Sequence, residues 1–282
     1  MADAQGSKRV DFSSAATGRA AVMQALHNEL GTFIDLAVNA TEQDWLAQSA
    51  CEGWATRDVV GHLTDTTQTY LARYIIALND WPAPEPIGMG SYTPAINEGA
   101  VSFRHIPQFE LIGRLKGPSD RLMEIFDNLT DDQWAGLMVH HKFARPVPSF
   151  MMVMFQLLDY VFHVWDIKIG LNGDAHMSVE GAGVLASLMP TLMMMSFDAG
   201  RAGSDPFELA LDVKGPYGAT SVVSYKDGQF QIVDGDISGV STVITYDTEE
   251  DFCLENFGRR ETGKITGDTA QGERFKTLFN WL

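Results

Sequence analysis

Four polar side chains interrupt an otherwise apolar segment of this sequence, and their types are those that bind metal ions. Their positions follow the spacing i, i+3, i+7 and i+10, which on a helix confines them to a stripe about 80° wide. The four residues are Gln156, Asp159, His163 and Asp166. Burying an unpaired carboxylate or imidazole costs several kcal/mol. The pattern therefore predicts that these groups pair with one another, face a wet cavity or bind a cation.

Asp159 and His163 stand four residues apart, so they point to the same side of a helix. This spacing is typical of two metal ligands carried by one helix. A third ligand must come from another segment, and His62 is the best candidate. Asp65 could orient the ring of His62, and Asp166 could do the same for His163. The alternative interpretation is a polar core in which an aspartate and a histidine bridge two helices without metal.

These side chains require helices to position them, and helical periodicity dominates up to about residue 200. The expected helices span Thr17–Ala37, a segment beginning at Thr56, parts of Glu98–Asn128, Pro148–Ile169 and Glu180–Ala199. After about residue 206 the apolar residues alternate, and Asp227-Gly228 predicts a hairpin turn. We therefore expect an α+β protein with two domains, a helical bundle over residues 15–200 and a smaller α+β domain over residues 201–282.

The charge composition of the chain limits the kinds of molecule that it is expected to bind. The 282 residues include 20 Lys and Arg against 37 Asp and Glu, a net charge of −17. This excess of acid argues against nucleic acid and anionic membranes as partners. Two cysteines are too few for a disulfide framework. The N-terminal residues carry no apolar run, and the apolar stretch 150–164 is short and polar-interrupted, so we expect neither a secretion signal nor a membrane span. A cytoplasmic location is the expectation.

Two segments carry a resemblance to a known family. They are Trp54-Ala-Thr-Arg-Asp-Val-Val-Gly-His62-Leu and Asp159-Tyr-Val-Phe-His163-Val-Trp-Asp166. Both resemble the signature segments of the mycothiol-dependent maleylpyruvate isomerases, which belong to the DinB-like metalloenzymes. The similarity extends over about Thr17–Gly170.

The resemblance implies a DinB-like four-helix bundle that holds a divalent metal through His62, Asp159 and His163. The family usually carries a glutamate at the position of Asp159, and the shorter side chain draws the metal about one methylene closer to its helix. Zn²⁺ suits two imidazoles and one carboxylate, while Ni²⁺, Fe²⁺ and Mn²⁺ remain alternatives.

The C-terminal part resembles a sterol-carrier-protein type 2-like domain. Lys264-Ile-Thr-Gly-Asp268 and the closing segment Thr269–Leu282, expected to be helical, carry this resemblance. In related isomerases such a domain helps to close the site over the substrate, which does not require lipid binding.

The expected function is that of a metal-dependent enzyme with mycothiol as its thiol cosubstrate. A free thiol has a pKa of about 8.5, and a metal ion deprotonates it. The thiolate would add to an electrophilic small molecule, giving either a cis–trans isomerase or a thiol S-transferase. The alternatives are a non-catalytic carrier of lipid or another small molecule on a relic bundle, and a metal-dependent hydrolase. The sequence indicates neither the substrate nor the oligomeric state, and Arg145 is one candidate for contacting an anionic substrate.

Overall fold

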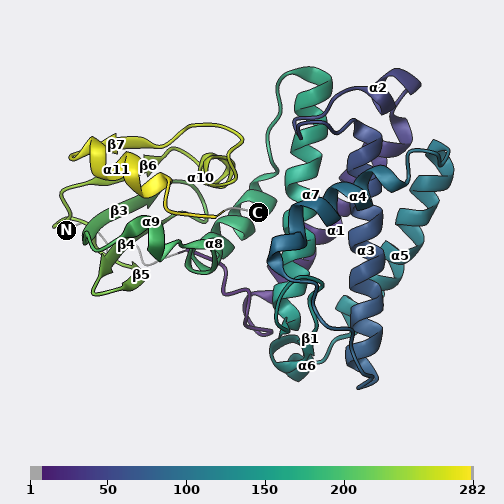
Figure 1. Ribbon diagram of the computed structural model, residues 1–282, viewed down its shortest axis with the longest axis horizontal. Coiled ribbons are helices and arrows are strands. Elements are labelled where there is room, and N and C mark those ends of the chain that lie inside the picture. Colours follow the sequence, from purple (N-terminus) through teal and green to yellow (C-terminus); the bar gives the residue numbers. More distant parts are fainter. Residues whose placement is uncertain (1–7, 281–282) are drawn as a thin grey trace. The chain divides into compact units, whose positions relative to one another are not determined.

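The protein divides into two compact units in its computed structural model, which describes residues 8–280 (Figure 1). Residues 12–181 form the helical unit, and residues 8–11 with 182–280 form the sheet unit. The division falls inside α8 (Val179–Ser196), about one helix before residue 200, where the sequence changes its periodicity. α8 is a single helix that also contains Pro190, so no break in the helix marks the division between the units.

Four long helices make up the core of the helical unit. Each of them packs against two others of the set: α1 and α3 each contact both α5 and α7. These helices are α1 (Arg19–Asn39), α3 (Thr56–Leu78), α5 (Gln108–Asn128) and α7 (Ser149–Asn172). The closed set of contacts is that of a four-helix bundle and confirms the predicted fold class.

Shorter elements connect the long helices. They are α2 (Glu42–Leu46), η1 (Met89–Ser91), α4 (Tyr92–Ser102), α6 (Asp131–Gly136) and the antiparallel pair β1 (Met138–Val139) and β2 (Val147–Pro148). α4 packs closely on α3 at Gly61, where an added Cβ would lie 2.4 Å from the carbonyl oxygen of Ala100. The glycine before His62 therefore allows α4 to approach the turn of α3 that carries this histidine.

The start of α3 is fixed by Asp58, whose side chain is almost fully buried. Its carboxylate accepts a hydrogen bond from the backbone N–H of Ala55 at 3.0 Å and two from Arg104, at 2.7 and 2.8 Å. An acidic residue in the first turn also interacts favourably with the helix dipole. Asp58 therefore anchors the segment that leads into α3.

α7 is largely buried in the helical unit and is apolar on nearly all sides. It ends at Gly173, which adopts a left-handed conformation with φ of 71°. Among the described residues, α7 and α8 are long and apolar enough to cross a membrane by length and composition alone. In α7, however, 78% of that apolar window is buried inside the protein. Its composition is accounted for by a place in the core.

The sheet unit contains a five-stranded sheet in the order β5-β4-β3-β6-β7. Its strands are β3 (Phe207–Val213), β4 (Ala219–Lys226), β5 (Gln229–Asp234), β6 (Val243–Tyr246) and β7 (Lys264–Thr266). β3 and β6 pair in parallel, and the other neighbours are antiparallel. Asp227 and Gly228, both with positive φ, form the predicted turn between β4 and β5.

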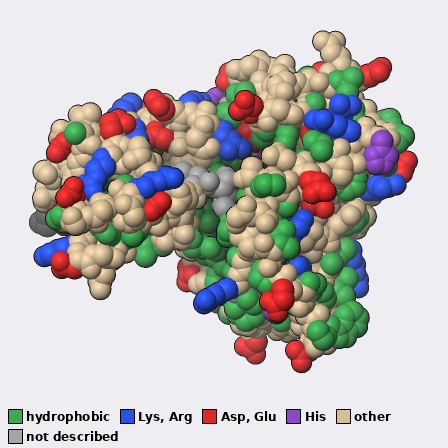
Figure 2. All heavy atoms as spheres, viewed as in Figure 1, with side chains coloured by type: hydrophobic (Ala, Val, Ile, Leu, Met, Phe, Trp, Pro, Cys, Tyr) green, Lys and Arg blue, Asp and Glu red, His purple; other side chains and the backbone are tan. Residues whose placement is uncertain are grey.

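Three short helices accompany the sheet: α9 (Ala199–Ala202), α10 (Glu249–Asn256) and α11 (Thr269–Lys276). α11 ends at Lys276, earlier than the expected closing helix, whose last residue, Leu282, lies outside the described residues. Acidic and basic side chains are interspersed over the face of the molecule in Figure 2. On that face the net charge of −17 is not gathered into one acidic patch.

Candidate metal centre

The three predicted ligands lie together between two neighbouring helices of the bundle. His62 comes from α3, and Asp159 and His163 come from successive turns of α7. One ligand atom from each residue lies within 4.8 Å of the other two. The histidines are buried, with exposed fractions of 5% and 7%, and the Asp159 side chain is 16% exposed. Residues 97 positions apart in the chain thus form one compact cluster.

His62 has no hydrogen bond to its ring within residues 8–280. Its Nε2 lies 3.8 Å from Oδ1 of Asp159, which is longer than a hydrogen bond. The ring packs against Trp54, with centroids 5.2 Å apart, and lies 4.9 Å from the ring of His163 at an interplanar angle of 80°. A buried imidazole without a hydrogen bond is costly, so an additional partner in this cluster would stabilise it.

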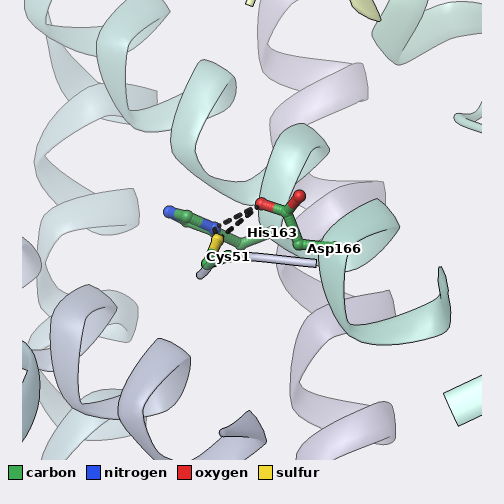
Figure 3. Close-up of side chains that lie close together, drawn as sticks. All are labelled: Cys51, His163 and Asp166. Atoms are coloured by element: carbon green, nitrogen blue, oxygen red, sulfur yellow. Dashed lines mark hydrogen bonds and ion pairs between the residues drawn. The ribbon is translucent and has the colours of Figure 1, made fainter. Parts of the chain in front are cut away.

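Asp166, which is fully buried, holds the Nδ1 edge of the His163 ring (Figure 3). Nδ1 of His163 lies 3.0 Å from Oδ2 of Asp166. A carboxylate only accepts hydrogen bonds, so Nδ1 carries the hydrogen, and the lone pair of Nε2 is left for a ligand. This is the role that the sequence predicted for Asp166.

Cys51, His163 and Asp166 form a second group of side chains, next to the three predicted ligands. Its thiol donates to Oδ2 of Asp166 at 3.1 Å, and its Sγ lies 3.8 Å from Nδ1 of His163. Cys51 belongs to the segment before α3, while the other two side chains come from α7 (Figure 3). The segment approaches α7 closely at Gly170, where an added Cβ would lie 2.3 Å from the carbonyl oxygen of Gln48. No motif in the sequence marks Cys51 as part of the site.

Burial lowers the pKa of His163 below its ordinary value, and the hydrogen bond to Asp166 opposes this shift. The nearby ring of His62 lowers the pKa further. The neutral imidazole is therefore favoured, and this is the form that binds metal ions.

The donor set fits a divalent metal. Zinc bonds of about 2.0–2.1 Å place two tetrahedral ligand atoms about 3.4 Å apart. The measured separation of 3.8 Å between His62 and Asp159 is close to this value. Three protein ligands also leave coordination positions for a substrate.

Asp65 lies elsewhere than predicted. Its carboxylate accepts from Nζ of Lys142 at 3.2 Å and packs against Gly99 of α4. Within residues 8–280 no hydrogen bond or ion pair joins it to the ring of His62, so the expected orienting role stays a prediction. On α3, Asp65 is turned about 60° away from His62, which directs it toward α4.

Further polar and aromatic side chains surround Asp159 and were missed in the sequence. Burial raises the pKa of Tyr70 and Tyr92, and the negative charge of Asp159 raises both further. Burial lowers the pKa of His141, which Asp159 opposes. The rings of Tyr70 and His141 have centroids 6.4 Å apart. Tyr70 could have been inferred from its place two turns beyond His62 on α3, whereas His141 comes from an irregular segment without a pattern.

The sequence model described as the mycothiol maleylpyruvate isomerase N-terminal domain matches residues 26–168. The chain belongs to this family. The matched region contains His62, Asp159, His163 and Asp166, which carried the resemblance in the sequence. The family is one of enzymes, which confirms the enzyme class predicted for this chain.

Solved structures of the mycothiol-dependent maleylpyruvate isomerase share the fold. The crystal structure of that isomerase matches with a TM-score of 0.60 and 14% identity, covering 90% of this chain and 95% of that chain. A histidine-to-alanine variant of it gives a TM-score of 0.61 and 13% identity over the same shares. Similarity at this identity establishes the fold of both units. It does not identify the C-terminal domain as sterol-carrier-like, which stays a prediction.

A third structure, the colibactin self-resistance protein ClbS in complex with double-stranded DNA, has a TM-score of 0.47 and 12% identity. It covers 55% of this chain and 95% of that chain, and the similarity is too low to support an inference about DNA. No curated protein sequence matches this chain.

Proposed function

We propose that this protein is a metal-dependent enzyme that activates mycothiol for addition to an electrophilic small molecule. Membership of the mycothiol maleylpyruvate isomerase family supports the thiol and the class of substrate. The metal is supported by one observation: the ligand atoms of His62, Asp159 and His163 converge within 4.8 Å. Hydrogen bonds within the described residues do not satisfy the ring of His62, as they would in a polar core.

His62, Asp159 and His163 would hold the metal, and zinc is the ion that this donor set favours. When bound, the metal lowers the pKa of a coordinated thiol, so that a thiolate is present at neutral pH. Asp166 keeps the hydrogen of His163 on Nδ1, away from the cluster. Trp54 covers one side of the His62 ring and helps to exclude water.

The reaction proposed for this site is the isomerisation of an activated cis alkene. The thiolate sulfur forms a bond to one alkene carbon, and the electron pair moves onto the adjacent electron-withdrawing group. The former double bond then rotates as a single bond. Expulsion of the thiolate restores the double bond in the trans form, so no atoms are gained or lost. If a proton captures the carbanion instead, the thiol stays on the product, and the enzyme is an S-transferase.

Turnover with and without the thiol tests this proposal. Maleylpyruvate is the first substrate to examine, because the matching structures are described as acting on it. We expect conversion that requires mycothiol and that is lost in His163→Ala. Conversion without any thiol would contradict the proposal and favour a hydrolase or another metal-dependent reaction. A protein that binds lipid stoichiometrically and contains no metal would instead favour the carrier.

A further inference from the structure

Arg73 is a buried cation without a carboxylate partner. Its exposed fraction is 9%, and its Nη1 donates to the backbone carbonyl of Pro84 at 3.0 Å. Within residues 8–280, no carboxylate oxygen lies within 4.0 Å of its guanidinium nitrogens. Removing a guanidinium from water without a counter-ion is unfavourable. A bound anion from outside the chain would supply the negative charge that the guanidinium of Arg73 lacks.

Several other cations of the helical unit lie beside carboxylates. Lys142 pairs with Asp65, and Arg104 makes a bidentate pair with Asp58. Arg19, which is also largely buried, donates to three backbone carbonyls and lies 3.7 Å from Asp131. Arg73 differs from these residues because, among the described residues, its guanidinium has a single hydrogen-bond acceptor, the neutral carbonyl of Pro84.

The position of Arg73 on α3 directs it to the same side of the helix as His62. Eleven residues separate the two, which returns the helix to within about 20° of the same direction and advances it by about 16 Å. Tyr70 lies between them, and its ring faces that of His141. His141 also packs against Phe155 of α7, one turn before Asp159, with centroids 5.7 Å apart. Tyr70, His141 and Phe155 therefore form a path of packed side chains that leads from the region of Arg73 toward the metal cluster.

The charges at the two ends of this path are opposite. Arg73 lowers and Asp159 raises the pKa of His141, so both charges are near enough to act on one ring. The path consists of Tyr70, His141 and Phe155, whose aromatic rings suit contact with a planar conjugated ligand. A molecule with a reactive carbon near Asp159 and a carboxylate at Arg73 would match both ends.

We infer that Arg73 binds a carboxylate of the substrate and so positions the substrate within the helical unit. The inference rests on the proposed function for the reacting end of the molecule. Arg73 would donate hydrogen bonds to the carboxylate from nitrogens that do not bond to Pro84, and a bidentate pair is the favoured geometry for this recognition. Its role is to bind and position, since the thiol chemistry takes place at the other end of the path.

Binding of maleate to the full-length, metal-loaded protein tests this inference without turnover. Maleate is a small cis alkene with two carboxylates, and its uncharged dimethyl ester serves as the matched probe. By calorimetry we expect maleate to bind and the ester not to bind. Arg73→Gln should weaken maleate binding at least tenfold, and Arg73→Lys should restore part of the affinity. Arg121→Gln, at an exposed arginine of α5, should leave the affinity unchanged.

Three results would overturn the inference. If maleate fails to bind the wild-type protein, or binds Arg73→Gln equally well, Arg73 is not a carboxylate receptor. If maleate binding disappears on removal of the metal and is unaffected by Arg73→Gln, the carboxylate binds the metal instead.

Thermal unfolding separates this role from a structural one. Without maleate, Arg73→Gln should unfold at the same temperature as the wild type or higher, because an uncompensated charge is removed. A lower unfolding temperature together with unchanged maleate affinity would make Arg73 a support for the segment at Pro84. Failure of the thiol assay would leave these binding results intact, so the two proposals can fail separately.

Discussion

Nδ1 of His163 lies 3.0 Å from Oδ2 of Asp166, and the thiol of Cys51 donates to the same oxygen at 3.1 Å. Asp166 is completely buried, so this carboxylate acts on its two neighbours without competition from water. The hydrogen bond fixes both the tautomer and the direction of the His163 ring. The metal site therefore depends on Asp166, although Asp166 is not one of the three converging ligands.

Asp166→Asn should weaken metal binding by about 10–100-fold, the usual effect of removing such a partner. An amide can donate to Nδ1, which would move the hydrogen to Nε2 and block the lone pair needed for the metal. A competition titration against a chelating dye measures the affinity. The matched control is Asp127→Asn, because Asp127 holds His27 at 3.1 Å in an exposed pair away from the cluster. Equal metal affinity in both variants would contradict the assigned role.

The stability of the protein should fall as the pH decreases below about 6.5, and His141 should contribute to this fall. Burial, assisted by the charge of Arg73, lowers its pKa in the folded state, while Asp159 opposes the shift. The unfolded chain therefore takes up the proton first, and stability is lost as the pH falls from the unfolded pKa through the folded one. Above the unfolded pKa this contribution is fully present.

His141→Phe keeps an aromatic ring among its neighbours and cannot titrate. Unfolding temperatures measured between pH 5 and pH 7.5 should therefore depend less on pH than those of the wild type. His105→Phe, at an exposed histidine, should leave the dependence unchanged. If the unfolding temperature of His141→Phe depends on pH as strongly as that of the wild type, burial of the His141 ring does not contribute to the pH dependence of stability.

Gly61→Ala should destabilise the helical unit by about 1–3 kcal/mol, the usual cost of overpacking. The new Cβ would lie 2.4 Å from the carbonyl oxygen of Ala100, and backbone of α4 must move to admit it. Urea unfolding measures the loss. The control is Gly31→Ala in α1, where no atom lies within 4 Å of the new methyl group and a gain of about 0.5–1 kcal/mol is expected. A neutral Gly61→Ala would mean that α4 packs less closely on α3.

The bundle and the three converging side chains could be predicted because periodicity and motif spacing are local properties of the sequence. Asp159, His163 and Asp166 lie within eight residues, so their common helix fixes their relative directions. The helical period places Asp65 about 60° around α3 from His62, but the sequence does not show that Lys142 is its partner, which tertiary packing determines.

Cys51 and Arg73 could not be found in this way. Cys51 belongs to a segment without periodic structure, and tertiary packing alone brings it to Asp166. Arg73 lies on an amphipathic helix, where an arginine is ordinarily solvated. Its burial depends on the irregular segment that includes Pro84, whose path the sequence does not encode in any recognised pattern.

Metal content per chain tests the central claim most directly. Elemental mass spectrometry of the purified full-length protein should find close to one divalent metal ion per chain, with zinc predominant. Asp159→Ala and His163→Ala, checked for folding by circular dichroism, should contain almost none, and Asp127→Asn should contain as much as the wild type. A wild-type protein that holds no metal even after reconstitution, or folded variants that keep it, would contradict the account and leave His62, Asp159 and His163 as a polar core.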